Sequence, residues 1–96
     1  MPKMIQKYEV DDFRQTHTVP YGSDFLSVMI NRPKGNIALY FAVDPKEEEF
    51  VTRTFWIVSI GRTIPNDSNF MGSFEQEGMN FHIFELLNRN GKKIIN

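Results

Sequence analysis

Hydrophobic side chains alternate with polar ones along most of this chain, at a spacing of two residues. Such a repeat places alternate side chains on opposite faces of a β-strand, whereas a helix needs a repeat near 3.6. The segments with this alternation are 4–10, 13–19, 25–30, 37–43, 52–60, 70–74 and 79–86. We therefore predict seven β-strands and no helix longer than two turns.

The two densest segments, 37–43 and 52–60, carry apolar residues on both faces. One face of these segments carries Ile37, Leu39, Phe41, Val43, Phe55 and Ile57. On the opposite face Tyr40 lies between two alanines, and Trp56 is followed by Val58. Apolar residues on both faces are typical of a central strand that is covered on both sides.

Short segments rich in Gly, Pro, Asn and Asp separate the predicted strands and indicate turns. The longest of them is 61–69, and Glu77-Gly78 is expected to close the last long hairpin. Seven short strands joined in this way predict an all-β fold, a small antiparallel sandwich or a partly open barrel.

The length of 96 residues allows one hydrophobic core, so we expect a single domain, 1–96. Residues 87–96 are predicted to be a C-terminal extension. Within it Asn90-Gly91 is a strong hairpin signal, because both turn positions need positive φ. The tail is therefore an eighth strand, paired within the chain or across a subunit boundary, or else a frayed end.

The composition narrows the function classes. Hydrophobic residues make up 41% and aromatic residues 14%, which is typical of a folded domain rather than a disordered chain. The net charge of −1 leaves no basic surplus, so general nucleic-acid binding is not expected. No segment approaches 18 apolar residues and the start lacks a signal-peptide pattern, so neither a membrane span nor export is expected. The absence of cysteine is compatible with a cytoplasmic location, which we predict.

Residues suited to catalysis are few. The chain has no cysteine, two histidines and no glycine-rich phosphate loop. His82 and Glu85 are three residues apart on a predicted strand, so they should point to opposite faces and not share a metal ion. We therefore expect no catalytic residue, no metal and no cofactor. The alternative, an enzyme, would use His82 or His17 with a carboxylate.

Aromatic residues are a second candidate for chemistry. Tyr40, Trp56 and Phe81 on neighbouring strands would stack bases if they shared one face. Such platforms also carry Lys and Arg, and these strands carry almost none beyond Arg53. Core packing is the favoured interpretation.

The loop 61–69 contains the best candidates for binding. Arg62 and Thr63 are followed by Asn66 and Asp67, and a loop held by a rigid sheet often carries the binding site. Arg62 is suited to a phosphate or carboxylate, because its guanidinium donates two parallel hydrogen bonds. The alternative is a proline-stiffened connection in which Asn and Asp only support the turn.

Several segments together resemble an uncharacterised family of short bacteriophage and bacterial proteins, classed as a domain of unknown function. The resemblance covers roughly residues 4–86, and it rests on these runs: Asp44-Pro45, Arg53-Thr54-Phe55-Trp56-Ile57, Gly61 to Pro65, Phe70-Met71-Gly72-Ser73-Phe74, and Phe81-His82-Ile83-Phe84-Glu85. One departure is that family members often carry His then Pro where Arg62 and Thr63 stand.

The resemblance implies a phage-type protein that acts in the host cytoplasm. Small phage proteins of this kind are often non-enzymatic inhibitors of host defence, or oligomers that sequester cyclic or ADP-ribose-type nucleotide signals. We therefore expect a non-catalytic homo-oligomer that evades host immunity by binding a host protein or a small anionic nucleotide. The alternative is a structural or accessory virion protein.

Overall fold

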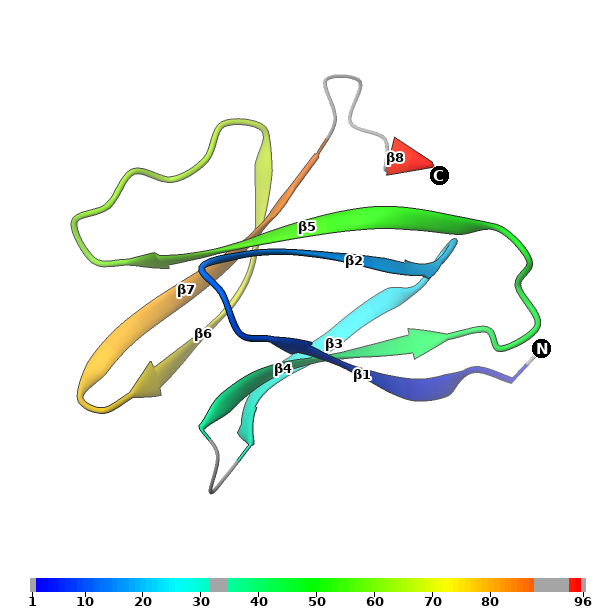
Figure 1. The fold of residues 1–96 in the computed structure, drawn as a ribbon, viewed down its shortest axis with the longest axis horizontal. Coiled ribbons are helices and arrows are strands. Elements are labelled where there is room, and N and C mark those ends of the chain that lie inside the picture. Colours follow the sequence, from blue (N-terminus) through cyan, green and yellow to red (C-terminus); the bar gives the residue numbers. More distant parts are fainter. Residues whose placement is uncertain (1, 32–34, 88–93, 96) are drawn as a thin grey trace.

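The computed structural model describes residues 2–31, 35–87 and 94–95, and every regular element in these ranges is a β-strand (Figure 1). The strands are β1 (Met4–Val10), β2 (Arg14–Pro20), β3 (Asp24–Asn31), β4 (Asn36–Val43), β5 (Phe50–Ser59), β6 (Ser68–Gln76), β7 (Met79–Leu86) and β8 (Ile94–Ile95). The predicted all-β fold is confirmed. No helix that could cross a membrane occurs in the part of the chain that the structure describes.

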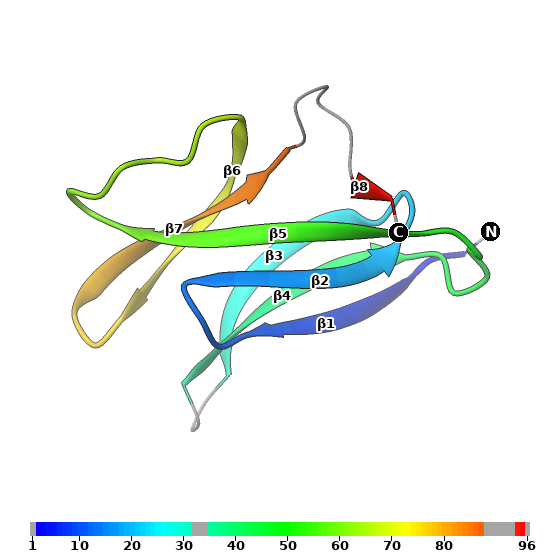
Figure 2. The ribbon, with the colours of Figure 1, turned by 45° about the horizontal axis from the view of Figure 1, so that its top comes forward.

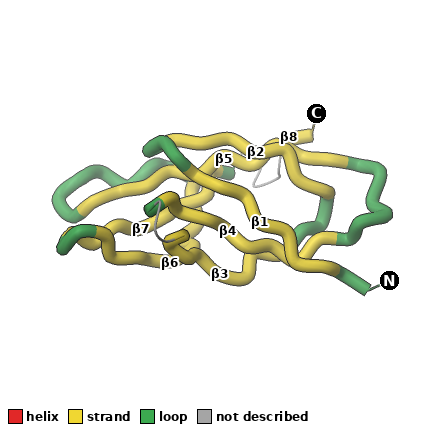
Figure 3. The backbone as a smooth tube through the Cα atoms, turned by 60° about the horizontal axis from the view of Figure 1, so that its bottom comes forward, coloured by secondary structure: helices red, strands yellow, loops and turns green. Residues whose placement is uncertain are grey.

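The strands form two antiparallel sheets that pack face to face, and no closed barrel. Sheet A has the order β1-β4-β3, and sheet B has the order β2-β5-β7-β6, with β8 added to β5. Figure 3 shows β2 and β5 of sheet B above β3 and β4 of sheet A, and Figure 2 shows β5 as the long strand of sheet B. β6 contacts β3 across the layers. Of the two predicted architectures, the structure is therefore the sandwich.

The core lies between the sheets and is built from the alternate residues that the sequence pattern assigned to one face. Leu39 and Phe41 of β4, Phe55 of β5 and Ile83 of β7 are fully buried. The rings of Phe41 and Phe55 lie 6.0 Å apart, centroid to centroid, and join the two layers. Because opposite faces alternate along each strand, the same registers leave Trp56 and Phe84 on the outer face of sheet B.

β6 extends two residues beyond each end of the predicted 70–74, because the polar residues Ser68, Asn69, Glu75 and Gln76 also pair with β7, and the strand contains a bulge. Phe70 pairs with Phe84 and Gly72 pairs with Ile83, so Met71 is the extra residue. The hairpin that follows is confirmed at Glu77-Gly78. Both residues have positive φ, 52° and 80°, which is the conformation of a type I′ turn.

The C-terminal strand pairs within the chain. Ile94 and Ile95 lie opposite Thr52 and Val51 of β5. Over this length β2 pairs with one edge of β5. β8 therefore pairs with the opposite edge of β5, which is also the edge that pairs with β7. The predicted eighth strand is therefore present, whereas the predicted Asn90-Gly91 turn lies outside the described residues.

Candidate functional site

A groove of about 860 Å³ lies at the end of β5 that is far from the N-terminus. Figure 1 shows that the start of β2, the end of β5, the start of the loop 60–67 and the β6–β7 turn all lie toward this end of the molecule. We call it the Arg62 groove. Its lining residues are Phe13, Arg14, Trp56, Ile57, Val58, Ser59, Gly61, Arg62, Thr63, Met79 and Phe81. The structure thus brings two of the four predicted binding residues, Arg62 and Thr63, to a concave site.

The groove exists because β5 runs past the beginning of β2. Their pairing begins with Arg14 opposite Trp56, and the Ile57 amide donates to the Phe13 carbonyl over 2.8 Å. β5 continues to Ser59, which is paired on its other edge with β7. The unfilled space beside the last residues of β5 is the groove.

Two guanidinium groups line the groove. Arg62 is exposed and follows Gly61, whose φ of 89° turns the chain out of β5. The Arg62 amide donates to the Ser59 carbonyl over 3.2 Å, which holds this turn. Arg14 lies over the indole of Trp56 at 5.7 Å. Within residues 2–31 and 35–87, neither guanidinium forms an ion pair, so both charges remain available to a ligand.

The other two predicted binding residues, Asn66 and Asp67, do not line the groove. Asp67 has a φ of 52°, and its carbonyl accepts a hydrogen bond from the Leu87 amide over 2.8 Å. The Ser68 hydroxyl donates to the Pro65 carbonyl over 2.7 Å. This half of the loop therefore has the turn-supporting role of the alternative interpretation.

A second hollow, of about 300 Å³, opens between the sheets at the same end of the molecule. We call it the aspartate pocket. Its lining residues are Val10, Asp11, Asp12, Phe13, Gly35, Asn36, Ile37, Ile57, Phe74, Gln76 and Phe81. Three of these side chains, Phe13, Ile57 and Phe81, also line the Arg62 groove, so the two hollows adjoin.

The histidines lie apart from these hollows. His82 points to the outer face of sheet B, where its Nδ1 lies 2.7 Å from the Ser73 hydroxyl. Glu85 points to the inner face, opposite to His82, as the spacing of the two residues predicted. Its side chain is buried. His17 bonds the Glu9 carbonyl through Nε2 over 2.7 Å. Among the described residues, no three His, Cys, Asp or Glu side chains gather as a metal site.

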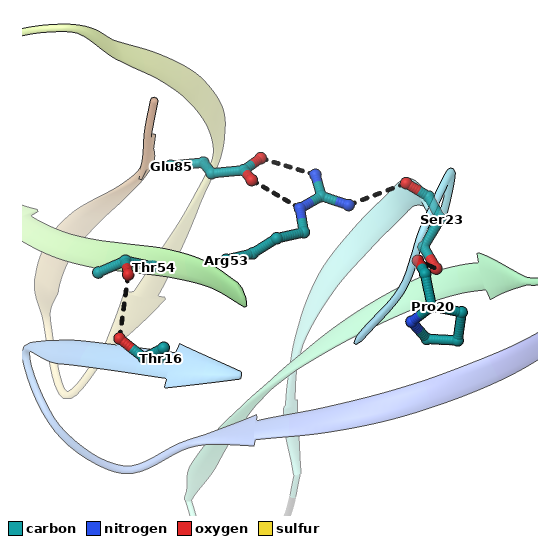
Figure 4. Close-up of polar contacts among 6 residues, drawn as sticks. All are labelled: Thr16, Pro20, Ser23, Arg53, Thr54 and Glu85. Atoms are coloured by element: carbon teal, nitrogen blue, oxygen red, sulfur yellow. Dashed lines mark hydrogen bonds and ion pairs between the residues drawn. The ribbon is translucent and has the colours of Figure 1, made fainter. Parts of the chain in front are cut away.

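Arg53 and Glu85 form a buried ion pair that the sequence analysis did not foresee (Figure 4). Arg53 Nε and Nη2 donate to the two Glu85 carboxylate oxygens over 2.6 and 2.7 Å, and Nη1 donates to the Ser23 carbonyl over 2.8 Å. The guanidinium also lies 4.7 Å above the ring of Phe41. The pair ties β5, β7 and the β2–β3 turn together. Burial raises the pKa of the nearby Tyr8 hydroxyl, and the Arg53 charge offsets part of that rise.

The outer face of sheet B carries a row of aromatic side chains across three strands. Trp56 lies opposite Phe84, and Phe84 lies opposite Phe70, with ring centroids of the last two 5.6 Å apart. Phe70 is 61% exposed. Tyr40, Trp56 and Phe81 do not form a base-stacking platform, the interpretation that was not favoured, because Tyr40 belongs to sheet A and Phe81 points inward.

Arg14 and Phe13 are the site residues that sequence reasoning missed. Both lie at the β1–β2 turn, more than 40 positions before Arg62, and only the pairing of β2 with β5 brings them to the groove. The sequence did carry a signal, because an aromatic residue and a cation, Phe13 and Arg14, directly follow the Asp11-Asp12 turn.

Comparison with known protein families identifies the family of the chain. The family described as "Domain of unknown function (DUF7352)" matches the chain over residues 1–93. No curated protein and no solved structure matches it. The expected likeness to a family of unknown function is confirmed, over a longer stretch than residues 4–86.

Proposed function

The chain belongs to the DUF7352 family, and we propose that it is a non-catalytic binding module whose Arg62 groove takes a small anionic ligand of the nucleotide type. The observation that carries the proposal is the meeting of Arg62 and Arg14 in one groove beside Trp56. The two arginines come from different elements, and the pairing of β2 with β5 holds one of them in place.

The chemistry of the groove favours phosphate at its cationic end. Guanidinium groups bind phosphate oxygens through pairs of parallel hydrogen bonds, which a lysine does not offer. The Thr63 and Ser59 hydroxyls add donors beside them. The groove volume of about 860 Å³ lies within the range of roughly 300 to 1,000 Å³ for small-ligand sites.

The biological setting that we propose follows from the resemblance to short phage and bacterial proteins. The protein would be phage-encoded and act in the host cytoplasm as a homo-oligomer. There it would sequester a nucleotide signal of host defence, or inhibit a defence protein through the same groove. Light scattering of the purified protein tests the oligomer, since a monomer at micromolar concentration contradicts that part.

Thermal unfolding tests the ligand class. The probes are cyclic di-GMP, cyclic di-AMP and ADP-ribose, each added to wild type, to Arg62→Ala and to Lys46→Ala. Lys46 is the matched control, because it is an exposed cation on the β4–β5 connection, outside the groove. A probe at 100 times its dissociation constant stabilises the fold by about 2.7 kcal/mol. We expect this shift in wild type and Lys46→Ala and its loss in Arg62→Ala. No shift with any probe contradicts the nucleotide proposal.

A role in the virion is the second candidate, and the outer aromatic row of the half-buried Trp56 and Phe84 and the exposed Phe70 favours it. Apolar residues on an outer sheet face are typical of assembly contacts. This candidate predicts large oligomers by light scattering and co-purification with particles, both reduced by Phe70→Ser. A small oligomer that is absent from particles contradicts it.

A further inference from the structure

The four strands that end the two sheets, β1, β3, β2 and β6, differ in how their free edges are protected. β3 and β6 each contain a bulge, and they contact each other where the two layers meet. β2 ends at Pro20, which has no amide to donate. β1 has neither bulge nor proline, and its seven residues pair with β4 without a register shift. A regular edge of this kind is a template for another strand.

The backbone of alternate β1 residues faces the free edge. In an antiparallel ladder the amide and carbonyl of one residue point to the same side. The Lys7 carbonyl accepts a hydrogen bond from Gln6 Nε2 over 3.5 Å, and the Glu9 carbonyl is bonded to His17 Nε2 over 2.7 Å. Side chains reach these two carbonyls because both point away from β4. Ile5, Lys7 and Glu9 therefore present their backbone to the edge, and an added strand is the partner that matches such a row.

The charges of β1 restrict how a second copy could pair with it. In an antiparallel pair of identical strands, a two-fold axis passes through one residue, because residues that face the edge must lie opposite each other. An axis at Ile5 would place Lys7 opposite Lys3 of the second copy. An axis at Lys7 would place the two copies of Lys7 opposite each other. Like charges directly opposite are destabilising, so neither register is favoured.

Two further registers differ at Glu9. An axis at Tyr8 would place the Glu9 carbonyl, which already bonds His17, in the middle of the new ladder. An axis at Gln6 moves that carbonyl to the end of the ladder and covers the whole length of β1. It also places Glu9 opposite Lys3 of the second copy at both ends, so that opposite charges meet. The axis at Gln6 is therefore the register that the strand favours.

The exposed apolar residues of β1 gain cover in the same register. Met4 is 51% exposed and would lie opposite Tyr8 of the second copy. Ile5 is 66% exposed and would lie opposite Lys7, whose hydrocarbon stem covers apolar surface. Burial of these side chains favours association.

We propose that two copies of the chain pair through β1, antiparallel about a two-fold axis at Gln6, so that two three-stranded sheets A form one six-stranded sheet. The occupant of the edge is a second copy because the charges of β1 complement themselves. Lys3 Nζ has three donors, of which two bond the Gly22 carbonyl and Asp24 within one copy, and the third remains for Glu9 of the other. This inference rests on the homo-oligomer of the proposed function and gives it an interface, but it does not depend on the nucleotide.

Disulfide trapping tests the axis, because the chain has no cysteine and a single added one reports on a single position. Gln6 lies opposite itself in a pair without backbone bonds, where the Cα atoms are about 4.5 Å apart, within the range of a disulfide. Ile5→Cys is the matched control, because its two copies would be displaced by two residues, beyond the disulfide limit of about 7 Å. Ile60→Cys measures random collision, since Ile60 is 77% exposed and lies outside β1.

A second measurement removes an edge donor. Ile5→Pro takes one outward amide from each copy and is tolerated at a sheet edge. It should raise the dimer dissociation constant about tenfold, measured by light scattering over a dilution series. Glu75→Pro is the control on the β6 edge. Gln76 and Met79 flank the two-residue turn and bond each other, so the Glu75 amide points away from β7.

We expect oxidised glutathione to convert Gln6→Cys to a disulfide-linked dimer and to leave Ile5→Cys and Ile60→Cys monomeric. Equal trapping of Gln6→Cys and Ile60→Cys overturns the interface. A dimer that Ile5→Pro leaves intact, or that Glu75→Pro weakens as much, also overturns it, while the proposed homo-oligomer stands. A monomer at every concentration, without trapping of Gln6→Cys, overturns both.

Discussion

The buried pair of Arg53 and Glu85 predicts a large difference between removing one charge and removing both. Their side chains are only 7% and 4% exposed, and the guanidinium makes two bonds to the carboxylate and one to the Ser23 carbonyl. Replacing Glu85 by Gln leaves the Arg53 charge buried without its counter-ion. Removing one partner of a buried pair costs about 3–5 kcal/mol of unfolding free energy.

The double variant Arg53→Met/Glu85→Leu removes both charges and should be far less damaging. Apolar replacement of a buried pair is neutral or stabilising by about 1–4 kcal/mol. Against this gain, the Ser23 carbonyl loses its donor, which costs about 1–3 kcal/mol. The two effects nearly cancel. We therefore expect the free energy of unfolding of the double variant to lie within about 2 kcal/mol of the wild-type value.

Urea unfolding followed by the fluorescence of Trp56, the single tryptophan, measures these differences. Lys7→Met is the matched control, because Lys7 and Glu9 form an exposed pair at 3.6 Å, and such pairs contribute less than about 1 kcal/mol. The reasoning is refuted if Glu85→Gln loses no more than this control. It is also refuted if the double variant loses as much unfolding free energy as the single variants Arg53→Met and Glu85→Leu added together.

The β6–β7 turn and the exposed pair of Lys3 and Asp24 give two smaller tests. Both turn positions have positive φ, which Asn and Gly adopt more readily than other residues. In urea unfolding, Glu77→Asn should therefore raise the unfolding free energy by about 0.5 kcal/mol, and Gly78→Ala should lower it by about 1 kcal/mol. Equal stabilities of the two variants and wild type would contradict the turn type. Lys3 Nζ donates to Asp24 Oδ2 over 2.8 Å and lowers the pKa of that carboxyl. The contribution of this pair to stability is therefore present above the unfolded-state pKa of Asp24 and is lost as pH falls through the lower folded-state pKa. In an NMR titration Asp24 should titrate at a higher pH in Lys3→Met, and an unchanged midpoint would contradict the contact.

The strands and their inward faces were predictable because each depends on neighbours two residues away. Leu39, Phe41 and Phe55 are buried as the alternation indicated. The prediction fell short at both ends of β6, because Ser68-Asn69 and Glu75-Gln76 are polar and show no alternation with apolar residues. The local pattern also did not show that Met71 is an extra residue, because the bulge is defined by the pairing with β7.

The sites depend on strand pairings over long separations, which a single sequence does not specify. Arg62 was predictable as a loop cation, but its partner Arg14 reaches the groove only because β2 pairs with β5. Arg53 and Glu85 are 32 positions apart. They left a signal, since each is a charge at an inward position of an otherwise apolar strand face, and their opposite signs indicated a pair.

The central claim is that an anionic nucleotide binds at the end of β5, and amide NMR spectra recorded during a GMP titration test it most directly. The indole N–H of Trp56 gives a single, unambiguous signal from the groove. We predict that this signal and the amides of Phe13 and Arg62 shift in wild type and stay in place in Arg62→Ala. Shifts confined to the outer aromatic residues Phe70 and Phe84, or no shifts at all, would contradict the account.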